Sequence, residues 1–457
     1  MRICKKTGLS VFLCVILVLA YEGFAFGAVS SEEAAKLGTT LTGVGAEMAG
    51  NKDGTIPPYT GGLTMSPPNY VKGSGVRPDP FANEKPLFSI NAQNMAQYAD
   101  KLTEGTKVLM KKYSTFRIDV YKSHRTSAFP DYVIKNTTKN AVTAKTANGG
   151  LSLLGARGGV PFPIPKDGYE VMWNHLTRYM GRANEGDLAC WMVDSNGRLM
   201  LATKFKWMDE APYYDDDLTR QDADLVYKEQ GRFYGPARRA GEVAMLLDPL
   251  DYYAKGGRGA YQYLPGQRRV KLAPEFGFDT PNFATSGTNV FDESHLFNGS
   301  MERYSMQLMG KKEMYVPYNC YRTHYHPVTA ELYTPKHLNP DLVRWELHRV
   351  WVVEATLKPD KRHIYPKRRF YLDEDSWSAL AAENYDALNN MYSTNFTFHA
   401  PCYDGLVPTS RFNLVYNFIT GVYCSEFWPG AGGYLRACKV RPERDWAPQA
   451  MAAQGIR

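Results

Sequence analysis

Three ionisable residues in the later half of the chain are of the types that bind metal ions. His324 and His326 are separated by one residue, and Glu331 follows five residues later. Alternate side chains of a β-strand point to the same face, so a His-x-His pair on a strand would direct both imidazoles toward one ion. No third ligand is clearly in place, and Pro327 would end such a strand. We therefore expect no bound metal or other cofactor, and keep His324, His326 and Glu331 as the candidates for a metal-dependent hydrolase.

Other catalytic motifs do not occur in the sequence. There is no G-x-S-x-G segment around a nucleophilic serine, and the glycine-containing stretches 158–165 and 256–259 lack the Lys-Ser/Thr pair of a phosphate-binding loop. Ser286 and Ser294 lie near His295 in the chain, but closeness in sequence does not make a catalytic triad. The sequence therefore predicts a protein without catalytic residues.

A basic segment, YLPGQRRVKL, has the pattern of a β-hairpin. Pro265 and Gly266 fit the centre of a type II turn, in which proline fixes the first φ and glycine takes the positive φ of the second position. Arg268 and Arg269 would then lie on the second strand and point to opposite faces. One of them could line a cavity mouth or meet an anionic headgroup. The alternative is an ordinary salt bridge within the sheet.

A second hairpin is predicted from residues 344–357 and 362–373, which flank the turn KPDK. One face of the first strand would carry Trp345, Leu347, Trp351 and Val353. These four side chains are candidates for the lining of an apolar cavity, and the alternative is that they belong to the ordinary core.

The candidate residues described above must be positioned by the fold of the chain. Most of this fold is predicted to be β-strand. Short turns between successive strands favour an antiparallel sheet. Helices are expected at 91–111, at 169–179 and, capped by Asp373 or Asp375, at the start of 373–384. We expect a mainly β, α+β fold: a large curved antiparallel half-barrel with helices covering its open side, which would enclose an apolar cavity.

The N-terminus has the features of a cleaved signal peptide. Three basic residues precede an apolar run from Val11 to Ala20, which is shorter than the ~20 residues of a membrane span, and small residues follow. We therefore predict an exported protein. The predicted division of the chain is a signal peptide at 1–27, a Gly/Pro-rich extended arm at 28–87, a β domain at 88–440 and a C-terminal tail at 441–457.

Charge and cysteine content narrow the class of protein further. Loss of residues 1–27 removes three basic residues and one acidic residue, which leaves 51 Lys and Arg against 46 Asp and Glu, a net charge of +5. This charge is too small to indicate a nucleic-acid partner but allows transient contact with a membrane. An odd number of cysteines remains, so at least one thiol must be free; they are Cys190, Cys320, Cys402, Cys424 and Cys438.

Several longer blocks of sequence resemble a family of exported proteins from Gram-negative bacteria, the domain of unknown function 1329, which is associated with outer-membrane lipoprotein sorting. The blocks are GTIPPYTGGL, YLPGQRRVKLAPEFGFDTPNF, FDESHLFNGSMERYSMQLMGKKEMYVPYN and RWELHRVWVVEATLKPDKRHIYPKRRFYLDEDSW. This resemblance implies a fold similar to the lipoprotein carriers LolA and LolB, an incomplete barrel that binds acyl chains, and no established catalytic residue.

The resemblance further implies a role in the periplasm, as a carrier or binding protein for a lipid-like molecule. The expected partners are that small molecule and either an exporter of the resistance-nodulation-division type or an outer-membrane protein. The alternatives are an adaptor that links a transporter to an outer-membrane partner through the arm, and the metal-dependent hydrolase described above.

Overall fold

The structure of the protein is a computed structural model that describes residues 26–409 and 411–455. The predicted signal peptide lies outside the described residues except for Phe26 and Gly27, which form the short strand β1. Strand β1 pairs with β4 (Lys145–Ala147), which pairs with β5 (Ser152–Leu154) in a small antiparallel sheet.

One large sheet organises the described part of the chain and contains sixteen strands. The order along it is β11-β10-β9-β8-β7-β6-β18-β17-β16-β15-β14-β13-β3-β2, with β12 also paired to β13 and β19 to β6. The bounds in chain order are β2 Phe88–Ile90, β3 Ile118–Val120, β6 Ala183–Val193, β7 Leu199–Glu210, β8 Leu225–Gly235, β9 Val243–Pro249, β10 Gly259–Leu264, β11 Arg269–Leu272, β12 Tyr304–Pro317, β13 Trp345–Leu357, β14 Lys367–Asp373, β15 Ala379–Tyr385, β16 Met391–Thr397, β17 Asn413–Asn417, β18 Tyr423–Glu426 and β19 Tyr434–Ala437.

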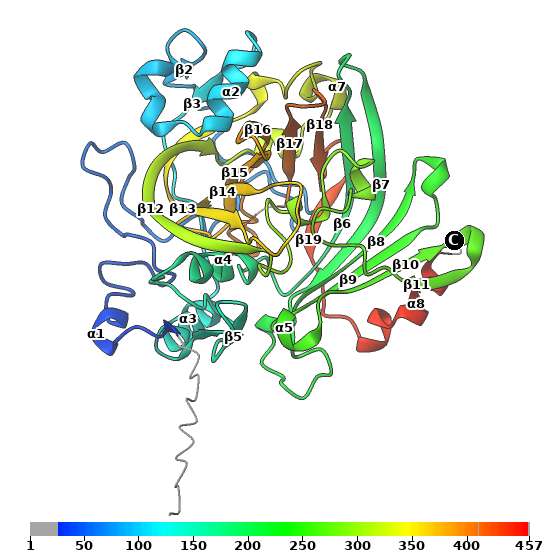
Figure 1. Cartoon of the computed structure of the whole chain (residues 1–457). Helices are drawn as coiled ribbons and strands as arrows, with labels where there is room; N and C mark the ends of the chain where they lie inside the picture. The colour runs from blue at the N-terminus through cyan, green and yellow to red at the C-terminus, as the bar shows by residue number, and fades with distance from the viewer. Residues whose placement is uncertain (1–25, 410, 456–457) are drawn as a thin grey trace, which may run out of the picture.

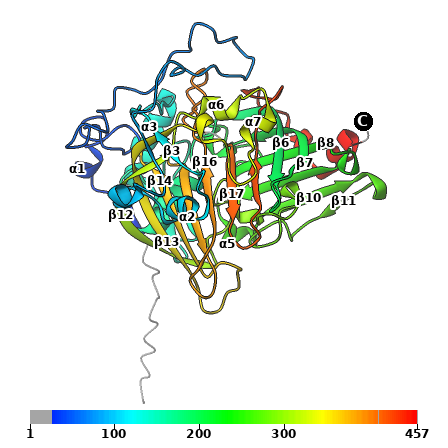
Figure 2. The ribbon, with the colours of Figure 1, turned by 90° about the horizontal axis from the view of Figure 1, so that it is seen from above.

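The sheet is strongly curved and does not close. Strands β12 and β13 bend through a wide arc, and β8 to β11 spread away on the other side (Figure 1). Seen from above, the sheet runs from β12 and β13 at one side to β10 and β11 at the other (Figure 2). Nearly all pairs are antiparallel, the exception being a single parallel bridge between β3 and β13. The predicted fold, a large curved antiparallel half-barrel with few helices, is confirmed.

Helices cover both faces of the sheet, but unevenly. Helix α2 (Glu104–Lys112) packs on β15 and β16, whereas α4 (Gly168–Leu176) packs on β12 and β13 on the opposite side. Helix α3 (Asp131–Thr143) joins the core around α4, and α8 (Pro448–Gly455) covers the outer side of β9 to β11. The remaining short helices are α1 Ser31–Ala34, α5 Tyr252–Lys255, α6 Tyr321–His324 and α7 Thr329–Leu332.

The hairpin predicted at 344–373 is present as β13 and β14, but two predicted helices differ. The segment 91–111 contains a 3-10 helix, Met95–Lys101, and then α2, because the Thr103 side chain accepts a hydrogen bond from Thr106 N and starts a new helix. The helix predicted within 373–384 is wrong: this segment is a turn followed by β15, whose residues are buried on both faces. The sequence of a strand buried on both faces is a continuous apolar run, and such a run has the same pattern as the sequence of a buried helix.

Residues 28–87 run over the surface of the domain with little regular structure beyond α1 (Figure 1). Side chains fasten this arm at several points. Ile56 lies in the core on the α2 side of the sheet. Arg77 Nε donates to Asp404 Oδ1 at 2.5 Å, and Trp377 Nε1 donates to the carbonyl oxygen of Val44 at 3.0 Å.

Two further properties of the described residues bear on the predictions. None of their helices has the length and apolar character that crossing a membrane requires. Cys190, Cys320, Cys402, Cys424 and Cys438 are all free thiols, so the cysteines form no disulfide within the described part of the chain.

Candidate functional site

An apolar cavity of about 70 Å³ lies on the concave face of the sheet, over strands β6 to β9. Its outer wall is residues 273–303, the connection between β11 and β12, which we call the plug; the plug crosses the sheet as irregular chain and short 3-10 turns. Strands β7 to β9 and the residue after β18 contribute the apolar side chains Phe205, Trp207, Phe233, Ala244, Leu246 and Phe427. The plug contributes Phe276, Phe283, Ala284 and Phe291.

Two small residues create the space. Gly231 on β8 lies directly opposite Trp207 on β7 and Ala244 on β9. The three positions therefore form one row across the concave face, in which only Trp207 has a large side chain. A Cβ added at Gly231 would meet only ordinary contacts, the nearest being Phe233 at 3.5 Å. The cavity thus exists because glycine and alanine occupy its floor.

The alternation of β9 positions this floor. Ala244 and Leu246 point to the cavity, whereas Val243 and Met245 point to the outer face and pack in the cluster beneath α8. This is the pattern of a strand with two buried faces, one covered by a helix and one covered by the plug.

Two carboxyl groups border the cavity. Glu426 Oε1 accepts hydrogen bonds from Asn282 at 2.6 Å, Asn289 at 3.1 Å and Ser294 at 3.2 Å, all of them plug residues. Burial raises the pKa of Glu426. Burial also raises the pKa of Glu229 to about 7, with a further contribution from the charge of Asp248.

The middle of the plug is held by polar and aromatic contacts together. Thr203 Oγ1 donates to the carbonyl oxygen of Ala284 at 2.8 Å, and Arg239 Nη1 donates to that of Phe283 at 3.1 Å. The Phe283 ring contacts Phe233 and Phe291, with centroids 5.5 and 5.8 Å apart. The middle of the plug is therefore attached both by hydrogen bonds to Glu426, Thr203 and Arg239 and by apolar side chains that line the cavity.

The four predicted lining residues belong to two different cores. Trp345 and Leu347 belong to the core on the α2 side of the sheet, where Trp345 packs on Phe396. Val353 belongs to the core on the concave side, and Trp351 packs against it beneath Lys311. Residues of the long, bent strand β13 thus contact one core at its start and another core further along its length. A lining role for these residues stays a prediction.

The basic hairpin exists as β10 and β11, with a different turn. Residues Pro265–Gln267 form a 3-10 turn, and Arg268, with φ of 49°, takes the left-handed conformation that was predicted for Gly266. Arg268 therefore belongs to the turn and not to the strand. Arg268 and Arg269 are both exposed at the free edge of the sheet and are not among the residues that line the cavity. Their contact with a headgroup stays a prediction.

The two histidines of the His-x-His pair face different surroundings. His324 ends α6, and its Nε2 lies 2.6 Å from the carbonyl oxygen of Phe398. Burial lowers the pKa of His324 to about 4. His326 Nε2 instead lies 2.9 Å from the exposed carboxylate of Glu331. The pair does not lie on a strand: His324 is the last residue of α6 and His326 follows the end of this helix.

Sequence reasoning predicted an apolar cavity but missed the residues that line it, because most of the outer wall has no periodic pattern. The available signal was composition: the plug contains five phenylalanines, at positions 276, 278, 283, 291 and 297, in a segment that reads as loop. Loops seldom contain so many large apolar side chains unless these side chains are buried.

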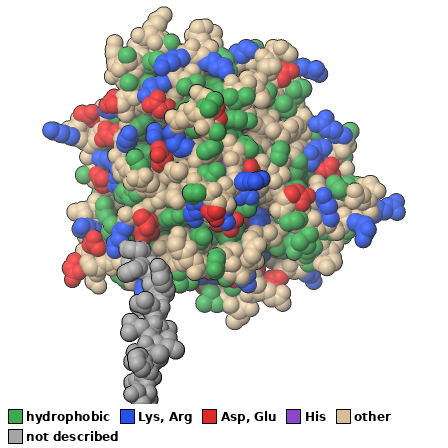
Figure 3. Space-filling model, in the orientation of Figure 1, with side chains coloured by type: hydrophobic (Ala, Val, Ile, Leu, Met, Phe, Trp, Pro, Cys, Tyr) green, Lys and Arg blue, Asp and Glu red, His purple; other side chains and the backbone are tan. Residues whose placement is uncertain are grey.

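On the face of the molecule that Figure 3 shows, basic and acidic side chains are interspersed among the described residues without a single-sign patch.

Comparisons with known proteins identify a family to which the sequence is similar. The model of the family described as "Protein of unknown function (DUF1329)" matches residues 89–452. The uncharacterized protein PA3922 of Pseudomonas aeruginosa is 38% identical over 436 residues, which cover 94% of this chain and 95% of that protein.

Solved structures are more distant. A Vibrio parahaemolyticus domain assigned to outer-membrane lipoprotein sorting is 16% identical, with a TM-score of 0.40 over 62% of this chain and 97% of that one. A DUF1329 family protein from Desulfovibrio piger is 14% identical, with a TM-score of 0.38 over 59% of this chain and 91% of that one. From the family match and the Pseudomonas relative, the chain belongs to the DUF1329 family.

Proposed function

We propose that the protein is a periplasmic carrier or binding protein for a lipid-like hydrophobic ligand, and that the ligand binds on the concave face beneath the plug. The observation that carries this proposal is the cavity whose floor is kept open by Gly231 and Ala244 and whose walls are aromatic. Ligand sites of soluble proteins are concave, mostly apolar and provided with a few polar groups, here Glu229 and Glu426. The role is non-catalytic.

The size of the cavity implies that the plug moves when a ligand enters. About 70 Å³ is well below the ~300–1,000 Å³ of typical ligand pockets. Phe283 and Phe291 of the plug occupy the apolar space that a ligand would need. In this proposal the plug acts as an internal substitute for the ligand, and binding exchanges plug side chains for ligand atoms.

Burial energies favour this exchange. A 14-carbon chain gains on the order of 10 kcal/mol from burial before the costs of binding, at ~0.8 kcal/mol per methylene. Withdrawing two phenylalanines costs roughly 1.5–3 kcal/mol each. The ligand therefore outweighs the plug, while the cost of displacing the plug leaves binding weak enough for release.

The proposal is tested by filling the space. A fluorescent polyene fatty acid is titrated into the mature protein, its Ala244→Leu variant and the matched control Ala240→Leu, which lies exposed in the turn after β8. Ala244→Leu should weaken binding at least tenfold, and Ala240→Leu should bind as the wild type does. Equal affinity of all three proteins, or no saturable binding by the wild type, would contradict the proposal.

One observation favours a second role, as an adaptor between a transporter of the resistance-nodulation-division type and an outer-membrane partner. The arm exposes two large apolar side chains, Met65 at 79% and Val71 at 71%. Exposed apolar side chains that lie close in the chain are a feature of protein contact sites. Replacing both by serine should then abolish capture of the partner and leave fatty-acid binding unchanged; loss of the binding instead would argue against this role.

A further inference from the structure

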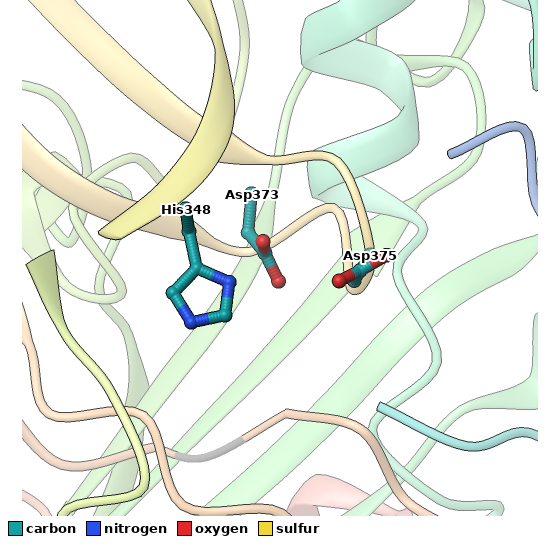
Figure 4. A group of neighbouring side chains, drawn as sticks. All are labelled: His348, Asp373 and Asp375. Atoms are coloured by element: carbon teal, nitrogen blue, oxygen red, sulfur yellow. The ribbon is translucent and has the colours of Figure 1, made fainter. Parts of the chain in front are cut away.

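A second site lies away from the cavity, where strand β13 faces the turn between β14 and β15. His348, Asp373 and Asp375 each offer one ligand atom there, and these atoms all lie within 4.8 Å of one another. All three residues are buried. Figure 4 shows the Nδ1 edge of the His348 ring turned toward the Asp373 carboxylate, with an oxygen of Asp375 beyond it.

Asp373 is the carboxylate of this region without a basic partner. Arg125 pairs with Asp375 through two hydrogen bonds of 2.9 and 2.6 Å, and Arg344 pairs with Glu346 at 2.5 Å. In the described part of the chain no Lys or Arg nitrogen lies within 4 Å of an Asp373 oxygen. A fully buried carboxylate without a cation is costly, which calls for a positive charge nearby.

One oxygen of Asp373 also lacks any hydrogen-bond partner. Oδ2 accepts from Ser376 Oγ at 2.6 Å and from the Tyr318 hydroxyl at 3.1 Å. Oδ1, although buried, has no partner among the described residues. Such an atom costs about 1–3 kcal/mol unless a water or an ion satisfies it. A water or an ion in the space between Asp373, His348 and Asp375 would supply the missing partner.

The imidazole of His348 is set up as a ligand. Its Nε2 lies 3.0 Å from Glu346 Oε2. Because a carboxylate accepts hydrogen bonds, this contact places the ring proton on Nε2 and leaves the lone pair on Nδ1. Metal-bound histidines usually donate their second ring N–H to a carboxylate or carbonyl in this way. Arg125 holds the Asp375 carboxylate in place by donating a hydrogen bond to each of its oxygens. Each of these oxygens keeps a second lone pair that is available to a metal ion.

We propose that His348, Asp373 and Asp375 bind one divalent transition-metal ion, with Glu346 and Arg125 as positioning residues. One imidazole and two carboxylates form a mixed nitrogen and oxygen set that suits Zn²⁺, Mn²⁺ or Fe²⁺. Ligand atoms bonded at ~2.1 Å to one ion are roughly 3–3.5 Å apart, so small side-chain rotations complete the set. The site uses none of the histidines that the sequence singled out.

The burial of all three ligands makes this a structural site. The turn that carries Asp373 and Asp375 also holds the arm, since Trp377 Nε1 donates to Val44 O and Glu374 Oε2 accepts from Glu47 N at 3.4 Å. An ion that joins β13 to this turn therefore stabilises the docking of the arm on the domain.

The test is elemental analysis of the mature protein purified without nickel-affinity resin or chelator. About one transition-metal ion per chain is expected in the wild type and less than 0.2 in Asp373→Asn, which keeps the size of the side chain. His326→Ala is the matched control, because it removes a histidine from a different carboxylate contact, and it should retain the metal.

A second measurement on wild-type protein covers the case that Asp373→Asn does not fold. Treatment with chelator should lower the unfolding midpoint and speed proteolysis within residues 28–87, and adding back Zn²⁺ or Mn²⁺ should reverse both effects. Wild type that contains no metal and whose unfolding midpoint is unchanged by Zn²⁺, Mn²⁺ and Fe²⁺ would overturn the proposal and indicate a proton or water beside Asp373 instead.

Discussion

The two halves of the large sheet are built differently. In the half around β13 to β15, helices α2 and α4 cover opposite faces, every residue of β15 is buried, and buried ion pairs join Arg125 to Asp375 and Arg344 to Glu346. In the half around β7 to β11, irregular chain covers the concave face, small residues form the floor, and three of the four residues of β11 are exposed.

This difference separates two tasks. Charged pairs that are fully buried hold one geometry, because breaking any of them leaves an uncompensated charge. Phenylalanine contacts have no strict geometry and are exchangeable for other apolar atoms. Buried ion pairs also occur in the second half, between Lys228 and Glu210 and between Arg258 and Asp248. The part of that half suited to open for the proposed ligand is therefore the plug with its phenylalanines, and the strands around it belong to the scaffold.

The largest effect is expected from breaking the ion pairs of the first half. Arg125→Ala leaves the carboxylate of Asp375 buried and unpaired, and should lower the free energy of unfolding by about 3–5 kcal/mol. Arg117→Ala is the control, since the ion pairs of this partly exposed arginine should contribute about 1 kcal/mol or less. Denaturant unfolding measures both; similar losses in the two variants would contradict the claim that the buried ion pair of Arg125 holds the scaffold of the first half.

The next effect concerns the attachment of the plug. Glu426→Gln replaces an acceptor of several hydrogen bonds by a group that is half donor, and should cost about 2–3 kcal/mol. Hydrogen exchange of residues 281–294 should become faster while that of β13 to β15 stays unchanged. A uniform increase across the whole protein would mean that the plug does not open separately.

A smaller, pH-dependent effect is expected at Glu229. Its pKa is raised from 4.5 to about 7, so the folded state favours the protonated form. Its contribution to stability is fully present below pH 4.5 and is lost as the pH rises to 7. Glu229→Gln, which cannot ionise, should match the wild type at pH 5 and exceed it by about 1–2 kcal/mol at pH 8. An equal difference at both pH values would contradict the assignment.

The smallest effect concerns the basic edge of the second half. Replacing Arg268 or Arg269 by alanine should weaken binding to vesicles with anionic lipid by about 1 kcal/mol at low salt. Lys36→Ala, which lies near α1, should have no effect. Sedimentation of the protein with vesicles measures this, and identical binding by all variants would exclude a headgroup contact at this edge.

Much of the fold was predictable because its signals are local. The alternation along 344–357 and the turn at KPDK gave the β13–β14 hairpin. The segment 373–384 was mistaken for a helix because a strand buried on both faces lacks alternation, as Ala381 and Ala382 illustrate.

The two sites were less predictable because their parts come from distant segments. The plug has no periodic pattern, and its Phe283 packs on Phe233 of β8 and in the cluster around Leu246 of β9, both distant in the chain. His348 and Asp373 lie on the two paired strands of a hairpin that the sequence did predict. If the pairing register of these strands had also been predicted, the two residues would have been recognised as neighbours. The His324–His326 pair was misleading because the chain forms a helical turn at that point.

The central claim is that the cavity beneath the plug takes up an apolar ligand. Mass spectrometry of organic extracts, from wild type and Ala244→Leu purified from the native organism without detergent, tests it most directly. We predict a lipid-like species near one per chain in the wild type and its loss in Ala244→Leu. An empty wild type, or the same species at the same level in both proteins, would contradict the claim.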